Sequence, residues 1–151
     1  MFHLAELNVG TLRSPLDDPA TADFVDNLER INALADGSPG FVWRLQTDAG
    51  NATDVHVFDD PMTIVNLSVW DSLESLQAYV YRSDHTGFLR RRREWFLPMD
   101  GPATVLWWLP AGTLPSIDEA LARRRELLER GPTASAFTFR ATFPAPEAAS
   151  T

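Results

Sequence analysis

The chain has 151 residues, a net charge of −8 at pH 7, no cysteine, and 13 basic residues that are all arginine. The acidic balance argues against nucleic-acid binding, and the missing cysteine and lysine exclude disulfides, thiolate catalysis, thiolate zinc sites and a lysine Schiff base. No apolar run approaches the roughly 20 residues of a membrane span and no signal peptide is visible, so we predict a cytoplasmic protein that does not bind membranes.

The first 110 residues alternate between strand and helix patterns. The first strand, at 3–9, has Leu4, Glu6 and Asn8 on one face, and a helix follows from Asp18-Pro19 to about Gly37. The later elements predicted in this part are strands at 41–46, 63–70 and 103–109, a helix from 71 or 72 through 80, a helical segment at 88–96, and a short strand or lid at 55–58. This βαββαβ order predicts an α+β, ferredoxin-like protomer with two helices on one face of an antiparallel sheet.

The remaining residues predict an extension of the same domain. A helix begins at Ser116 and ends at Gly131-Pro132, and residues 137–143 alternate as a fifth strand. We therefore divide the chain into a ferredoxin-like domain at 1–110, a C-terminal helix and strand at 111–143 packed on it, and a disordered tail at 144–151.

The third strand carries the best candidate for a binding site. Asn66, Ser68 and Trp70 share one of its faces. Buried polar groups need partners, and a Trp can both form a pocket wall and donate one N–H. Beyond the following helix, His85 in the segment SDHTG is a candidate general base or haem ligand, or else a capping or loop histidine.

Two other groups of residues carry weaker signals. His3 and His56 could join His85 in a metal site, but no HxH or HxxxH spacing is present, so we expect none. The arginines at 90–93 are consecutive, so on a helix they point around its whole circumference. Most are then solvated or paired, while Arg90 is the candidate to reach the pocket and hold an anionic substrate.

With these elements in order, the chain resembles the DUF3291 family of uncharacterised proteins over roughly residues 3–143. The motifs that carry the resemblance are HLAELN at the start, GFVWRLQ on the second strand, and SVWDSLESLQAYVYRSDH on the third strand and helix. That family looks related to antibiotic biosynthesis monooxygenases of the dimeric α/β-barrel superfamily. The resemblance implies a ferredoxin-like protomer that pairs sheet to sheet, with a pocket for a flat aromatic molecule.

The resemblance also implies site residues. Cofactor-free quinone-forming monooxygenases of this kind use an Asn four residues before a Trp on this strand, and an Arg further on. Asn66, Trp70 and Arg90 match these positions. The Tyr that follows the Trp is replaced by Leu76 here, so Tyr79 or Tyr81 would have to substitute. Trp43, Ser68, Tyr79 and Tyr81 are the predicted substrate-binding residues.

The predicted function is that of a small-molecule enzyme acting on an aromatic or polyketide-like substrate, as a cofactor-independent monooxygenase or a related oxidoreductase or cyclase in secondary metabolism. In this reading His85 deprotonates a phenolic substrate, and Asn66, Trp70 and Arg90 stabilise the anions formed with O2. Two alternatives stay open. One is a non-catalytic ligand-binding or regulatory domain, and the other is a haem protein with His85 as axial ligand.

The strand patterns also predict a homodimer. Val65, Leu67 and Val69 lie opposite Ile64 and Trp70, so the sheet is apolar on both faces. Helices cover one face, and an exposed apolar area of the size left on the other would be unusual for a monomer. A sheet-to-sheet homodimer burying on the order of 2,000 Å² would remove it.

Overall fold

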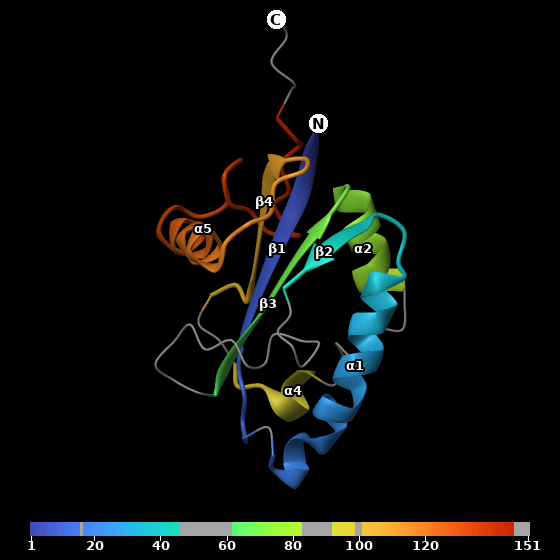
Figure 1. Ribbon diagram of the computed structural model, residues 1–151. Helices are drawn as coiled ribbons and strands as arrows, with labels where there is room; N and C mark the ends of the chain where they lie inside the picture. The colour runs from blue at the N-terminus through green and yellow to red at the C-terminus, as the bar shows by residue number, and fades with distance from the viewer. Residues whose placement is uncertain (16, 46–61, 83–91, 99–100, 147–151) are drawn as a thin grey trace, which may run out of the picture.

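The computed structural model of the chain describes residues 1–15, 17–45, 62–82, 92–98 and 101–146 (Figure 1). Its elements, in chain order, are β1 (Phe2–Thr11), η1 (Pro19–Thr21), α1 (Ala22–Asp36), β2 (Phe41–Arg44), β3 (Thr63–Trp70), α2 (Leu73–Arg82), α4 (Arg92–Trp95), β4 (Thr104–Pro110) and α5 (Ile117–Arg130). The predicted short strand at 55–58, residues 88–91 of the predicted helical segment, and 147–151 of the predicted tail lie outside the described residues.

The strands form one antiparallel sheet in the order β2-β3-β1-β4. This is the ferredoxin-like arrangement, so the predicted α+β fold of the protomer is confirmed. The register places Glu6 of β1 opposite Ser68 of β3, and Asn8 opposite Asn66. Four polar side chains of the central strands are thereby neighbours on one face.

Local signals in the sequence fix where the helices begin. The Asp18 carboxylate accepts a hydrogen bond from the Ala20 backbone N–H at 2.8 Å, ahead of η1 and α1. Ser72 and Ser116 use their hydroxyls in the same way at the starts of α2 and α5. Side-chain oxygens at these positions satisfy backbone donors that the first helical turn leaves free.

One glycine allows β2 to pass close to the start of α2. Gly40 has a φ of +83°, and a Cβ atom there would collide with the side chains of Ser75 and Asp71. The Asp71 backbone N–H donates to the Gly40 carbonyl at 2.8 Å. Only a residue without a side chain tolerates both this backbone conformation and this approach.

Helices α1 and α2 cover one face of the sheet, and α5 lies on the other (Figure 1). On the face of α1 and α2, Trp70, Leu4 and Leu106 pack with Ile31 of α1 and Leu76 of α2. Within the described residues no helix combines the length and apolar character that crossing a bilayer requires.

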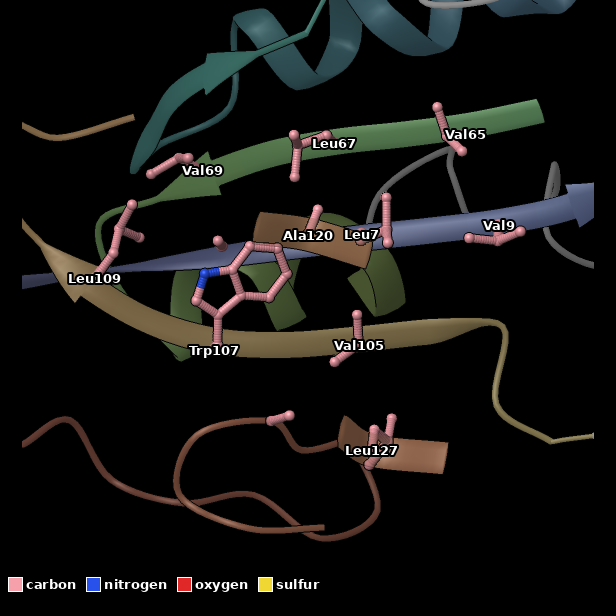
Figure 2. Close-up of a cluster of buried hydrophobic side chains, with 12 residues drawn as sticks. Leu7, Val9, Val65, Leu67, Val69, Val105, Trp107, Leu109, Ala120 and Leu127 are labelled. Atoms are coloured by element: carbon pink, nitrogen blue, oxygen red, sulfur yellow. The ribbon is translucent and has the colours of Figure 1, made fainter. Parts of the chain in front are cut away.

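Between α5 and the sheet face that it covers lies an apolar core, formed by one chain. It joins Leu7, Leu67, Val69 and Trp107 of the sheet to Leu127 of α5, and all five side chains are buried (Figure 2). The expectation that this face needs a partner sheet is therefore wrong, because the extension of the same chain already covers it. The argument for a homodimer from an exposed sheet face is therefore not supported.

The C-terminal segment differs from the predicted fifth strand. Residues 137–143 make one bridge to the edge of β4, through two 2.8 Å backbone hydrogen bonds between Phe137 and Leu106. A turn closed by a bridge between Thr138 and Ala141 then bends the chain. This turn brings Phe137, Phe139 and Phe143 into the same core, whereas a straight strand would carry the last two residues away from the first.

Candidate functional site: a pocket on the helical face

A pocket of about 370 Å³ lies on the face of the sheet that α1 and α2 cover. Its apolar wall includes Phe24 and Ile31 of α1, Phe41 of β2, Trp70 of β3 and Tyr79 of α2. The size and the mostly apolar lining fall in the range of small-molecule sites.

The floor of the pocket is polar. Five side chains from three strands line it, namely Glu6 and Asn8 of β1, Asn66 and Ser68 of β3, and Thr104 of β4. The Thr104 hydroxyl donates to the Asn8 carboxamide oxygen, and the Asn8 amide nitrogen donates to the Glu6 carboxylate at 2.8 Å. The first contact joins β4 to β1 and the second lies within β1, and together they fix donors and acceptors on the floor of an otherwise apolar space.

Glu6 is the buried ionisable group of this floor, with 5% of its surface exposed. Burial raises the pKa of its carboxyl from 4.5 to about 7, although hydrogen bonds from Asn8 and Ser68 act in the opposite direction. A carboxyl with such a pKa exchanges its proton near neutral pH, which is the property of a general acid or base.

Trp70 forms part of the wall through its ring. It stacks on Tyr79 with ring centroids 5.1 Å apart and meets Phe41 edge to face at 5.4 Å. Its indole N–H donates to the Ser68 hydroxyl oxygen at 3.1 Å. The predicted role of this N–H as a donor to a ligand therefore competes with a bond inside the wall.

Tyr79 is also held by the protein. Its hydroxyl donates to the Ile31 backbone carbonyl at 3.1 Å. Burial, with the negative charges of Glu6 and Asp36, raises the pKa of this phenol, while Arg44 lowers it. Tyr79 thus stays protonated at physiological pH and serves as a wall rather than as a proton acceptor.

Arg44 places a cation at the pocket. Its guanidinium makes two hydrogen bonds to the Asp36 carboxylate, at 2.7 and 3.2 Å. This paired geometry fixes the arginine against α1 and offsets its charge. Among the described residues, no group of three or more His, Asp or Glu side chains is placed to hold a metal ion.

The structure brings together five of the eight residues predicted from the sequence. Asn66, Ser68, Trp70, Tyr79 and Tyr81 all line the pocket, and Tyr81 is 55% exposed. The side chain of Tyr81 contacts the Phe139 ring edge to face, with centroids 5.7 Å apart.

The other three predicted residues are not placed in the pocket. His85 and Arg90 lie outside the described residues. Trp43 packs in the core on the α5 face, so its predicted place in the pocket is wrong. The pairing of β2 with β3 shifts register between Phe41 and Trp43, and this irregularity sends Phe41 to the pocket and Trp43 to the other face.

Sequence reasoning overlooked Glu6 and Arg44 as pocket residues. A signal for Glu6 was present, because the alternation of β1 placed it on the same face as Asn8. What the alternation could not give was the pairing of β1 with β3, which sets Glu6 opposite Ser68. Arg44 reaches the pocket only because of the shifted register in β2.

Comparison with known proteins gives a family match and several similar folds. The model of the family described as "Domain of unknown function (DUF3291)" matches residues 3–151. No curated protein matches the sequence. A variant of SnoaB, a cofactor-independent oxygenase from Streptomyces nogalater, is similar with a TM-score of 0.50 and 16% identity, over 76% of this chain and 98% of that chain.

Two further structures are similar at lower scores. NE2512, a protein of unknown function from Nitrosomonas europaea, has a TM-score of 0.49 and 19% identity, over 77% of this chain and 97% of that chain. The monooxygenase from ActVA-Orf6 of Streptomyces coelicolor, in complex with nanaomycin D, has a TM-score of 0.40 and 20% identity, over 76% of this chain and 92% of that chain. At 16% identity, the likeness to the SnoaB variant is one of fold.

Proposed function

The chain belongs to the DUF3291 family, and from this premise we propose that its pocket binds a small hydroxylated aromatic molecule and oxygenates it without a cofactor. The observation that carries the proposal is an apolar, aromatic-walled pocket of about 370 Å³ whose floor holds a buried carboxyl, hydrogen-bonded by the Asn8 amide and the Ser68 hydroxyl. The fold that the chain shares with SnoaB, a cofactor-independent oxygenase, agrees with this proposal.

The wall would hold the rings of the ligand. Trp70 and Tyr79 are stacked on each other, and Phe41 fixes the Trp70 ring from its edge. Rings held in this way present a rigid surface, so these side chains lose little conformational entropy when a flat ligand binds.

The polar floor would orient the ligand and stabilise charge. A hydroxyarene that loses its proton carries negative charge on oxygen and on ring carbon, and the Asn66 side-chain amide can donate to that anion. The anion reduces dioxygen, the two combine at a ring carbon to give a hydroperoxide, and loss of water leaves a quinone. The balance is one hydroxyarene and one dioxygen in, one quinone and one water out, so the electrons come from the substrate itself.

The probe for this proposal is 1-naphthol, which is electron-rich and has a free ring position opposite its hydroxyl. We expect wild-type protein to consume dioxygen in its presence and to place an atom from labelled dioxygen in the naphthoquinone product. Asn66→Ala should lower kcat about 100- to 1,000-fold, since the loss of one donor to a developing anion costs on this order.

The matched control is Asn27→Ala, which removes a partly exposed Asn on α1, outside the pocket lining, whose side chain bonds to Asp23 and Arg30. It should leave turnover unchanged. Binding of 1-naphthol without oxygen consumption would assign the pocket to a non-catalytic carrier or sensor. Equal turnover by wild type and Asn66→Ala would refute the role given to Asn66.

A further inference from the structure

Resting on the proposed function, we propose that the Glu6 carboxylate is the group that takes the proton from the hydroxyl of the substrate. The pocket would then select a neutral hydroxyarene, bound with its hydroxyl against β1. This assignment gives the reaction a base within the described part of the pocket and makes Glu6 a catalytic residue.

The first support is the position of Glu6. It lines the pocket, yet it is almost fully buried and lies in the middle of β1 between two neighbouring strands. The Asn8 amide and the Ser68 hydroxyl each donate to the carboxylate. A carboxylate has about four acceptor positions, so these two bonds orient the group and leave capacity for a donor on a ligand.

The second support is the charge around the pocket. Arg44 of β2 is the cation among the described lining residues, and Asp36 of α1 already pairs with it. The Tyr79 hydroxyl of α2 already donates a hydrogen bond to a backbone carbonyl. An anionic ligand would meet the ionised Glu6 unfavourably, and an ammonium ligand would have to lose its hydration in an apolar space. A neutral hydroxyl avoids both costs.

The chemistry of the step is a simple proton transfer. The O–H bond of the hydroxyarene breaks, an O–H bond forms on Glu6, and the negative charge moves from the carboxylate to the aromatic ring system. Burial brings the pKa of Glu6 to about 7, which is closer to that of a phenol than an exposed carboxyl would be. The transfer is therefore less unfavourable than with an ordinary Glu, while the group is still substantially ionised near neutral pH.

The test compares the binding of 1-naphthol with that of its methyl ether by calorimetry. The ether has the same rings but no proton to give. We expect wild-type protein to prefer 1-naphthol by about tenfold at pH 8, because a hydrogen bond to a charged acceptor is worth more than a neutral one. The preference should shrink as the pH falls below about 7, where Glu6 becomes protonated.

Glu6→Gln keeps the size of the side chain and removes its charge. It should bind the ether as wild type does, lose most of the preference for 1-naphthol, and show no dependence of that preference on pH. Oxygen consumption with 1-naphthol should fall at least 100-fold. Glu129→Gln, the same change at an exposed site on α5, should behave as wild type in every measurement.

The outcomes separate this inference from the function on which it rests. Full oxygen consumption by Glu6→Gln would overturn the role of Glu6 and leave the oxygenase proposal standing. A preference for 1-naphthol that vanishes in Glu6→Gln, in a protein that consumes no oxygen, would support Glu6 as the acceptor and refute oxygenation. Equal affinity of wild type for 1-naphthol and its ether across the pH range would overturn the inference without any variant.

Discussion

The placement of one carboxyl, that of Glu6, links the stability of this protein to pH. Folded Glu6 holds its proton up to about pH 7, whereas the unfolded side chain loses it near 4.5. The folded state binds more protons between these values, so the contribution of Glu6 to stability is full below pH 4.5 and is lost as the pH rises to about 7.

We therefore predict that Glu6→Gln stabilises the protein at neutral and higher pH. The shift in pKa corresponds to roughly 3 kcal/mol. The gain of the variant over wild type in the free energy of unfolding should grow between pH 4.5 and 7 and then level off. Urea unfolding at several pH values measures it, with Glu129→Gln as control. A gain that does not vary with pH would contradict the assignment of a raised pKa to Glu6.

At the scale of the elements, α5 packs on the sheet through a few apolar side chains, of which Ala120 and Leu127 are buried. Leu127 faces the sheet with 4% of its surface exposed, while its neighbour Leu128 is 46% exposed. The two residues are chemically identical and adjacent, so comparing the same substitution at each of them isolates the effect of burial in the core.

We predict that Leu127→Ala lowers the free energy of unfolding by about 2–4 kcal/mol, since it leaves a cavity against the sheet. Leu128→Ala should cost less than about 1 kcal/mol, because little buried surface is lost. Thermal or urea unfolding of the two variants provides the comparison. Equal losses would mean that α5 does not pack on the sheet through the Leu127 side.

At the scale of the whole molecule, the chain covers both faces of its own sheet. Helices α1 and α2 take one face and α5 the other, and the strand side chains of the α5 face are buried without a partner chain. A sheet-to-sheet dimer would have to displace α5 from the sheet. Breaking the apolar contacts of α5 costs free energy, which a dimer formed through an uncovered sheet face would not lose.

We predict a mass of 16.9 kDa by light scattering at micromolar concentration. Twice that mass would contradict this prediction and support the homodimer expected from the strand pattern. In that case Leu127→Ala distinguishes the two ways to form it. A dimer built by displacing α5 should become more stable when α5 is weakened, and a dimer that uses another surface should not respond.

The sequence by itself determined the elements and the class of fold. Alternation along 3–9 and 63–70, the caps at Asp18, Ser72 and Ser116, and the order of strands and helices depend on residues near one another in the chain. The same local patterns placed Asn66, Ser68 and Trp70 on one strand face, which is now a wall and floor of the pocket.

Only the tertiary structure decided which residues meet across strands and what covers each face. Glu6 became a pocket residue through its register with Ser68, and Trp43 left the pocket through the shifted register of β2. The C-terminal segment 137–143 contains a turn instead of forming a straight strand. Helix α5 covers the sheet face on which a partner sheet was expected. Register and docking depend on contacts far apart in the sequence, and the period of a single strand or helix carries no information about them.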